Sequence, residues 1–303
     1  MVKRIGTDWG LNVRMVLTLF LLAAVYLAFM GALWYFLGPG YGWVIVIVAG
    51  LLLLAQYYFS DKLILLSLGA REVGEQEAPQ LHDMVGRLAA MTGMPKPKVA
   101  IIESSVPNAL ATGRSPAHSV VAVTTGILET LDAEEMEAVL AHEMSHVIHR
   151  DMRVMAMASF FATVASFIVQ SGLWGGFGGG YGGGDREDRD RGNSFIVIFV
   201  ISLIVWAISF VLIRTLSRYR EYSADRGSAI ITGQPSKLAS ALVKISGRMQ
   251  RIPDQDLRQV EVGNTLMFFP AISRGSISEV FSTHPSLEHR IAKLQEMEAN
   301  LAR

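Results

Sequence analysis

Residues 142–146 read His-Glu-Met-Ser-His, which places two imidazoles four positions apart and a carboxylate directly after the first. On a helix, residues four apart share a face, so His142 and His146 are expected to point to the same side. In the H-E-x-x-H pattern the two His bind zinc, and the Glu, here Glu143, is the general base that activates water. The chemistry that this segment predicts is metal-assisted hydrolysis of a peptide bond.

Catalytic zinc sites usually take three protein ligands, so the two His leave this site incomplete. His149 lies near the same helical face, but it is too far along the axis to complete the site. Met152 stands where the extended motif H-E-x-x-H-x-x-G-x-x-H has its third His. Glu221 is the better candidate, and Asp225, one turn later, is placed to accept the ring N–H of a zinc-bound His. One alternative remains open, in which both acids pair with neighbouring arginines on a solvated helix: Arg218, Arg220 or Arg226.

Four apolar runs accompany these residues, and they are long enough, or nearly so, to cross about 30 Å of hydrocarbon. They cover residues 11–37, 43–59, 152–174 and 194–213. The sequence Gly-Pro-Gly-Tyr-Gly at 38–42 predicts a helix-breaking turn, and the Gly-rich segment 175–193 predicts a flexible connector. A cleaved signal peptide does not fit the first run, because the run is too long and no cleavage site follows it. The pattern therefore predicts two transmembrane hairpins, at 1–60 and 152–213.

Basic residues near the ends of the runs predict the orientation in the membrane. They flank the outer ends of both hairpins, at Lys3, Arg4, Arg14, Lys62, Arg71, Arg150, Arg153, Arg214, Arg218 and Arg220. The turn at 38–42 has none, and the segment 175–193 has three, Arg186, Arg189 and Arg191, which four acids offset. We therefore expect both termini and the metal motif to lie on the cytoplasmic side of a bacterial plasma membrane.

Two soluble segments, 61–151 and 214–303, are expected to form the two parts of a catalytic domain. In the first part we expect a helix at 78–91, strands at 98–102 and 119–124, and an irregular segment at 106–113. Asp132 and Glu135 form a capping box that predicts the start of the motif helix. In the second part we expect helices at 214–232, 235–250 and 285–301, with an irregular segment at 251–283.

Composition agrees with membrane insertion, since 51% of the residues are hydrophobic and only 18% are charged. The formal net charge is zero, which gives no indication of nucleic-acid binding. The absence of cysteine excludes disulfides and thiolate metal ligands.

Together the motifs resemble the HtpX family of membrane-integrated zinc metalloendopeptidases and, more distantly, the prenyl-protein (CAAX) endopeptidases. The match follows the family order over nearly the whole chain: Pro107-Asn108-Ala109 with Gly113, residues 124–128, residues 138–143, Ser145-His146, Arg150-Asp151, residues 221–225, and His284-Pro285-Ser286 with Arg290.

The resemblance implies a mainly α membrane protein with four transmembrane helices in two hairpins and a zincin-like (gluzincin) α+β catalytic domain with a small sheet. It implies that Glu221 is the third ligand of one Zn²⁺ per subunit. It also implies that Asn108 holds substrate backbone beside an edge strand at 120–123. Val120 and Ala122 of that strand are expected to pair with an extended substrate.

Two further roles follow from the resemblance or from conjecture. The resemblance implies that His284 lies near the metal, where it either donates to the oxyanion or covers the ion at rest. We expect Arg290 to anchor the last helix by pairing with a carboxylate such as Asp225.

The function that the resemblance implies is cleavage of misfolded or damaged membrane proteins on the cytoplasmic side, as quality control and stress response. Expected partners are membrane-protein substrates, the lipid bilayer, and other membrane proteases or quality-control proteins. A prenyl-protein endopeptidase is a rival, although four spans are too few for the enclosed chamber of that family. An intramembrane protease fits poorly because the motif helix carries too much charge for hydrocarbon. A scaffold with a structural metal would have no use for Glu143.

Overall fold

The computed structural model describes residues 9–171, 186–252 and 285–301. The chain divides into two compact units. Unit 1 comprises Met1–Leu11, Tyr58–Arg153 and Ser217–Arg303, and unit 2 comprises Asn12–Tyr57 and Val154–Leu216. Unit 1 therefore contains the metal motif together with Glu221, and unit 2 contains most of the apolar sequence.

A small mixed sheet lies in unit 1. Its strands are β1 (Arg71–Glu72), β2 (Lys98–Ile102), β3 (Ala109–Gly113) and β4 (Ser119–Thr124), in the order β1-β2-β4-β3. β2 and β4 are parallel, whereas β1 and β3 run antiparallel to their neighbours. The strands expected at 98–102 and 119–124 are confirmed with these bounds.

One prediction is wrong: the sequence predicts an irregular segment at 106–113, whereas the structure has the strand β3 in it. The strand reads Ala-Leu-Ala-Thr-Gly, which has little of the β-branched and aromatic character that marks strands in a sequence. Its pairing with β4 runs from Ala109 opposite Val123 to Gly113 opposite Ser119. The neighbouring strand, rather than local propensity, therefore decides the conformation of this segment.

The position of β4 corrects a second prediction, in which residues 120–123 formed an edge strand. Val120 pairs with Lys98 of β2 on one side and with Thr112 of β3 on the other, and Ala122 likewise has a partner on each side. The backbone groups of an inner strand are already used in two ladders, so β4 has no edge to offer a substrate. Within the part of the chain that the structure describes, β3 is the strand at that end of the sheet.

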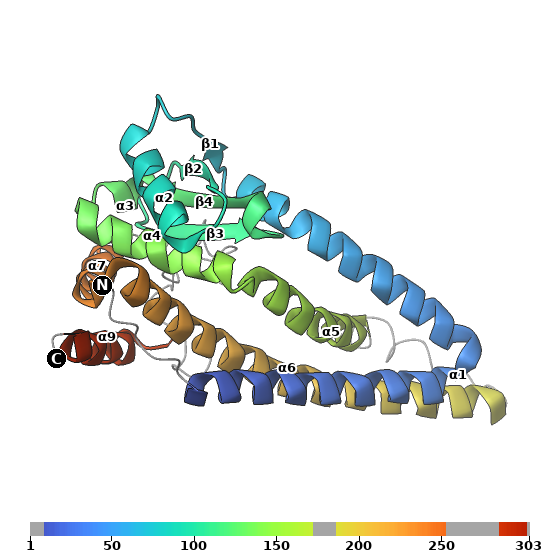
Figure 1. Ribbon diagram of the computed structural model, residues 1–303. Helices are drawn as coiled ribbons and strands as arrows, with labels where there is room; N and C mark the ends of the chain where they lie inside the picture. The colour runs from blue at the N-terminus through green and yellow to red at the C-terminus, as the bar shows by residue number, and fades with distance from the viewer. Residues whose placement is uncertain (1–8, 172–185, 253–284, 302–303) are drawn as a thin grey trace. The chain divides into compact units, whose positions relative to one another are not determined.

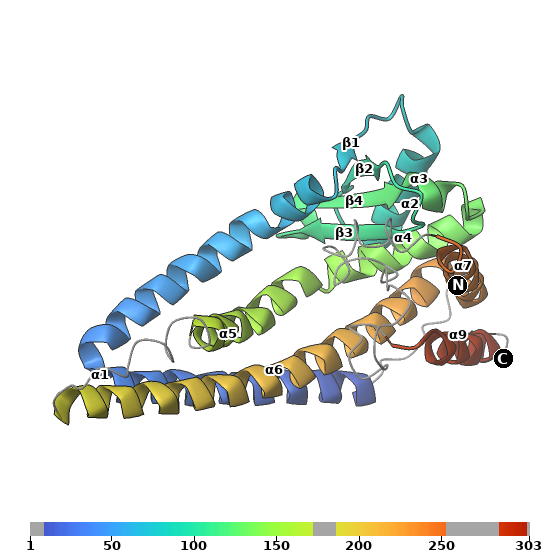
Figure 2. The same ribbon diagram turned by 180° about the vertical axis from the view of Figure 1, so that it is seen from behind.

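Helices cover the sheet and complete the core of unit 1. α2 (Pro79–Thr92), the short α3 (Thr125–Leu128), α4 (Ala133–Ile148), α7 (Pro235–Met249) and α9 (Leu287–Leu301) belong to it, with a 3-10 turn at Pro116–His118. α4 runs beside β3 and contacts it (Figure 1). α7 packs against α4 and α9 (Figure 2). Val139 and Leu140 of α4 and Leu242 of α7 are fully buried in this core, which holds the motif helix in place.

Unit 2 is built from parts of three helices: α1 (Trp9–Ser67), α5 (Asp151–Ser171) and α6 (Arg186–Thr232). Apolar side chains from all three pack together, among them Phe29, Ala165 and Val205. Within the described residues, Trp9–Phe36 and Ile196–Thr232 are long and apolar enough to cross a membrane, and Val154–Gln170 is a shorter apolar helix. Only 28% and 22% of the apolar windows of the two long segments are buried, so their outer faces would expose a large apolar surface to water. A lipid environment removes that cost.

The structure differs from the prediction of a helix break at 38–42. The helix is continuous from Trp9 to Ser67, yet the chain turns back on itself between two arms (Figure 1). Gly and Pro bend a helix without ending it when only a few backbone hydrogen bonds are lost. Several side chains of the expected span at 43–59 lie outside the described residues.

The last part of the connector predicted at 175–193 is helical instead, because α6 begins at Arg186. The glycines of the segment stop at Gly184, apart from Gly192, so the chain can become helical there. The rest of the connector lies outside the described residues. The expected fourth span at 194–213 and the expected polar helix at 214–232 are one continuous helix.

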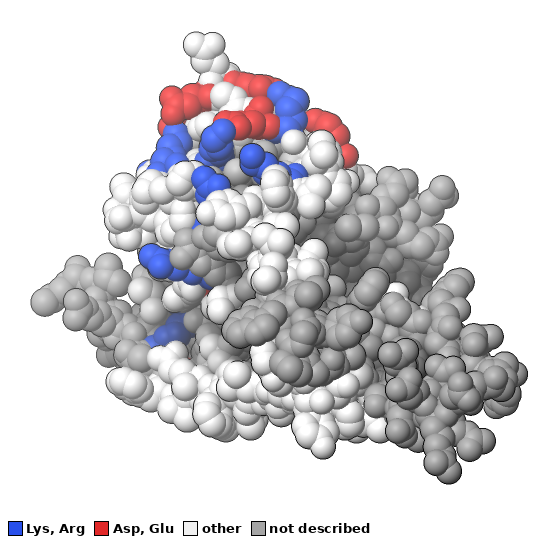
Figure 3. All heavy atoms as spheres, turned by 90° about the vertical axis from the view of Figure 1, so that its right-hand side faces the viewer, with Lys and Arg blue, Asp and Glu red and all other residues white. Residues whose placement is uncertain are grey.

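Charged side chains gather around β1 and the start of α2, at the top of the view in Figure 3. They alternate in sign and form exposed ion pairs: Arg71 with Glu77, Lys96 with Glu75, and Lys98 with Glu72. A surface of mixed sign offers no strong field of one sign to a polyanion such as nucleic acid.

Candidate active site

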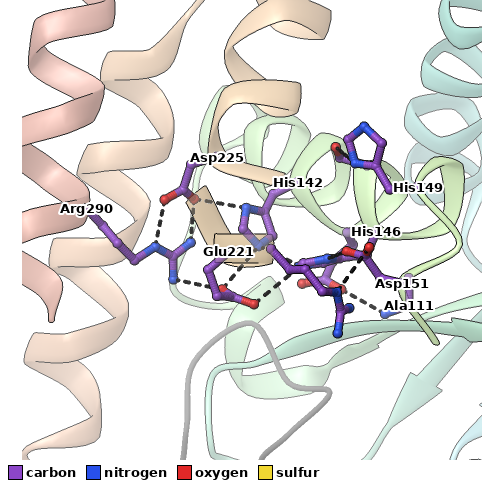
Figure 4. Close-up of polar contacts among 11 residues, drawn as sticks. Ala111, His142, His146, His149, Asp151, Glu221, Asp225 and Arg290 are labelled. Carbon is purple, nitrogen blue, oxygen red and sulfur yellow. Dashed lines mark hydrogen bonds and ion pairs between the residues drawn. The ribbon is translucent and has the colours of Figure 1, made fainter. Parts of the chain in front are cut away.

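α4 presents the two His of the motif on one face. The helix starts in the expected capping box, in which Asp132 accepts from the Glu135 amide and Glu135 accepts from the Asp132 amide. His142 is completely buried, and the side chain of His146 is 14% exposed. Their Nε2 atoms lie 3.2 Å apart (Figure 4).

α6 brings Glu221 to these two imidazoles. One carboxylate oxygen of Glu221 lies 3.5 Å from His146 Nε2, and the other lies 3.6 Å from His142 Nε2. One potential ligand atom from each of the three residues falls within 4.8 Å of the others. The structure therefore groups the three residues that the sequence and the family resemblance proposed as metal ligands.

Small residues allow α4 and α6 to approach this closely. Ser228 of α6 donates a hydrogen bond of 2.7 Å to the carbonyl of Ala138 in α4. A Cβ atom on Gly227 would lie only 2.7 Å from the Cβ of Ser145 and still closer to its hydroxyl. The absence of a side chain at Gly227 thus sets the distance between the helix that carries the His pair and the helix that carries Glu221.

Asp225 orients His142. Its Oδ1 lies 3.0 Å from His142 Nδ1, and Arg290 of α9 contacts the same carboxylate with two nitrogens, at 2.9 and 2.6 Å. Burial would raise the pKa of Asp225, but the charge of Arg290 and the contact with His142 outweigh burial and lower it. The ionised Asp225 favours the proton on Nδ1, which leaves the Nε2 lone pair free to bind a metal.

Asp151 orients His146 in the same way, a role that we did not assign from the sequence. Its Oδ2 lies 2.6 Å from His146 Nδ1, and its Oδ1 forms an ion pair of 3.0 Å with Arg220 Nε. Burial would raise the pKa of Asp151, but Arg220 and His146 lower it to about 2. The signal that could have identified it is its place five residues after His146, where α4 has ended and α5 begins.

Glu143 points from α4 toward the side of β3 that lies opposite β4. Its Oε2 accepts a hydrogen bond of 2.8 Å from the amide of Ala111, and its Oε1 is buried with no hydrogen-bond partner among the described residues. Burial raises the pKa of Glu143, which makes the carboxylate a stronger base than an exposed Glu. A buried acceptor with an open lone pair is suited to hold a water proton.

The arrangement of the lone pairs fits a metal ion. With both Nδ1 atoms facing ionised Asp, the two Nε2 lone pairs point toward the same place, which is repulsive unless a cation lies between them. Two imidazole nitrogens bound to one tetrahedral zinc at about 2.0–2.1 Å are separated by roughly 3.3 Å. The observed 3.2 Å matches this value closely.

The charge balance of the site leads to the same conclusion. Among the described residues, its buried charges are four acids and two arginines: Glu143, Asp151, Glu221, Asp225, Arg220 and Arg290. Buried charge must be balanced, and one divalent cation supplies the two missing positive charges. The pKa of His146 reflects the same excess of negative charge: burial alone would lower this pKa, but Asp151 and Glu221 raise it to about 10.

The remaining expected site residues are not part of this group. Asn108 is buried just before β3, where its side-chain oxygen accepts from the Ala109 amide. Val120 and Ala122 lie in the inner strand β4. His149 is turned away from the pair, near the Ser145 hydroxyl, as expected for a residue that is not a ligand (Figure 4). His284 lies outside the described residues.

Comparison with known proteins shows the family of the chain. The family model for peptidase family M48 matches residues 75–298. A protein named Protease HtpX homolog from Moorella thermoacetica is 56% identical over 99% of both chains. Protease HtpX homolog 2 from Methanosarcina mazei is 52% identical over the full length of both. In fold, the chain is similar to the crystal structure of S. mikatae Ste24p, with a TM-score of 0.50 and 19% identity, covering 94% of this chain and 66% of that one.

The full-length identity with the HtpX homologues confirms the resemblance drawn from the motifs. These matches run from end to end of the chain, so they include the apolar helices of unit 2. The chain belongs to peptidase family M48, and it is a membrane metalloprotease of the HtpX type.

Proposed function

We propose that the protein is a zinc-dependent endopeptidase that cuts misfolded or damaged membrane proteins on the cytoplasmic side of the plasma membrane. One observation carries the proposal. The ligand atoms of His142, His146 and Glu221 converge within 4.8 Å, and the base Glu143 follows His142 directly on the same helix. Two His and one carboxylate are the ligand set of catalytic zinc in several hydrolases, which leaves one coordination position for water or substrate.

When bound there, zinc supplies a Lewis acid that polarises the scissile carbonyl and lowers the pKa of a water molecule. The residues of the chain perform the other tasks. Glu143 accepts the proton of the attacking water at its open oxygen and then delivers it to the leaving amine. Asp225 and Asp151 keep the imidazoles in the tautomer that the ion requires. A carboxylate that is already buried and held by the Ala111 amide needs little reorganisation for these transfers.

The substrate strand is proposed to add to β3, in place of the strand at 120–123 that we expected from the sequence. The Ala111 amide is not used in the ladder with β4, because it donates to Glu143. That side of β3 therefore faces the base, and an extended peptide pairing there would pass close to the ligand cluster. Recognition through backbone groups gives a loose sequence preference, as a protease acting on damaged proteins requires. Asn108, at the start of β3, is proposed to contact the same strand.

The topology is part of the proposal. We infer four spans in two hairpins, with both termini and the active site in the cytoplasm, from the basic residues that flank the apolar runs. Substrates would reach the site from the bilayer, and other membrane proteases or quality-control proteins are proposed as partners. A prenyl-protein endopeptidase is not favoured, because the similarity to Ste24p at 19% identity is one of fold alone.

The experiment compares purified wild type with Glu143→Gln, using a membrane-protein reporter in a folded and a destabilised form. The variant should retain zinc at the wild-type stoichiometry and lose about 10²- to 10⁴-fold in cleavage rate, the usual contribution of a general base. Glu137→Gln is the matched control, because Glu137 lies on the same helix in a partly exposed pair with Arg87. Undiminished cleavage by Glu143→Gln would reject the assignment of the base. Equal cleavage of both reporter forms would reject selection of damaged substrates.

A further inference from the structure

The contacts of Asp151 point to a role in metal binding beyond that of an ordinary ion pair. The residue is 3% exposed, and each of its carboxylate oxygens has a different partner. Oδ2 accepts from His146 Nδ1 at 2.6 Å, and Oδ1 pairs with Arg220 Nε at 3.0 Å. Because Arg220 is itself only 7% exposed, water does not screen this chain of contacts.

We propose that Asp151, held by Arg220, is a positioning residue that orients His146 and thereby sets the affinity of the site for its metal. The inference deepens the proposed function and rests on it. Without Asp151 the imidazole of His146 could rotate about its side-chain bonds or place its proton on Nε2, and either change removes the lone pair from the ion. A carboxylate that accepts from Nδ1 also makes the ligating nitrogen more basic.

The backbone between α4 and α5 is arranged for this contact. Among the described residues other than glycine, Arg150 is the one with a positive φ, 56°, in the left-handed region. A residue with a Cβ atom adopts this conformation at a cost, so surrounding contacts must stabilise it. The conformation ends α4 and starts α5 at Asp151, so that the carboxylate lies beside a His only five positions earlier in the chain. A straight continuation of α4 would instead carry residue 151 around the axis, away from His146.

An acid paired with an arginine also holds the imidazole of His142, but these residues come from different helices. His142 is oriented by Asp225 of α6 and Arg290 of α9, whereas His146 is oriented by Asp151 of α5 and Arg220 of α6. α6 therefore contributes the ligand Glu221 and, directly before it, the arginine that fixes Asp151. A displacement of α6 would disturb the third ligand and the orientation of His146 together. Metal binding and the packing of α6 against α4 are thus coupled.

A purely structural role for Asp151 makes a different prediction. An acid in the first turn of a helix stabilises that helix, and α5 begins at Asp151. If this were its whole contribution, replacing Asp151 would lower the melting temperature without changing the metal site. The test must therefore measure the metal itself.

The experiment uses the full chain in detergent and measures the zinc dissociation constant by competition with a chelator. Asp151→Asn and Asp151→Ala are compared with wild type and with Glu137→Gln, which removes a charge from an ion pair on α4 away from the site. We expect zinc binding by both Asp151 variants to weaken by about 10- to 100-fold, the usual effect of losing a partner of a ligating His, with no change in Glu137→Gln. Arg220→Gln should weaken binding by less than Asp151→Ala, and Arg220→Lys should restore part of the loss.

Cobalt substitution gives a readout that stability does not affect. The visible spectrum of bound Co²⁺ reports ligand geometry, so it should change in Asp151→Asn and stay as in wild type in Glu137→Gln. Wild-type zinc affinity and an unchanged cobalt spectrum in both Asp151 variants would overturn the inference, whatever their melting temperatures. Failure of the proposed metal site is a separate outcome, recognised when His142→Ala binds zinc as tightly as wild type does.

Discussion

Replacing Gly227 with Ala should push α6, which carries Glu221, away from the His pair of α4. The new Cβ atom would lie 2.7 Å from Ser145 Cβ, whereas ordinary contact begins at 3.4 Å, so the two helices must move apart by about 0.7 Å at this point. Rotation of the Ser145 hydroxyl cannot relieve the overlap, because the Cβ atom itself is in the way. Overpacking of this kind costs about 1–3 kcal/mol of folding stability.

The effect on the metal should exceed the effect on stability. Ser145 directly precedes His146, and Gly227 lies on α6 with Glu221, so the shift acts on the distances between ligands. Metal sites keep their ligand distances to within about 0.2 Å, and a misplacement near 1 Å costs on the order of 10²-fold in rate. We therefore expect Gly227→Ala to lose one to two orders of magnitude in zinc affinity and in cleavage of the reporter.

The assay is chelator competition on the full chain, combined with thermal unfolding. Gly247→Ala is the control, because a Cβ at that position in α7 meets nothing within 4 Å, and Ala is the better helix former. The double variant Ser145→Gly with Gly227→Ala removes the overlap and should recover most of the zinc affinity, at the cost of a glycine in α4. If Gly227→Ala bound zinc as tightly as wild type, close packing at this point would not determine the site.

Two further predictions concern the buried charges. Arg290→Met should destabilise the protein by about 3–5 kcal/mol, because it leaves Asp225 buried without its counter-ion; a loss below about 1 kcal/mol in denaturation of the detergent-solubilised protein would show that Asp225 finds another partner. Removal of the metal by a chelator should lower the melting temperature, because the buried acids then lack two positive charges. Adding zinc back at about 100 times its dissociation constant should restore roughly 2.7 kcal/mol, and a melting temperature unaffected by either step would contradict the charge balance.

Much of the site was predictable because its signals are local. The four-residue spacing of His142 and His146 places both on one face of any helix, and the capping box at Asp132 marks where that helix starts. The amphipathic helix at 235–250 was recognisable from its periodicity and appears as α7. The lengths of the apolar runs, likewise, are a property of the chain itself.

The partners of these residues depended on contacts between distant segments. From spacing alone, Glu221 was equally suited to the metal and to a neighbouring arginine; the close approach of α6 to α4 at Gly227 brings it to the imidazoles. β3 is a strand because β4 lies beside it, and that pairing makes β3, instead of β4, the outer strand among the described residues. Asp151 reaches His146 because the backbone turns at Arg150.

The sequence by itself determined which groups could bind a metal and activate water, because helical periodicity acts over four or five residues. The tertiary structure alone decided which acid completes the ligand set, which strand faces the base and how the imidazole of His142 is oriented. These features depend on packing between segments that are tens of residues apart, and no local pattern encodes such distances.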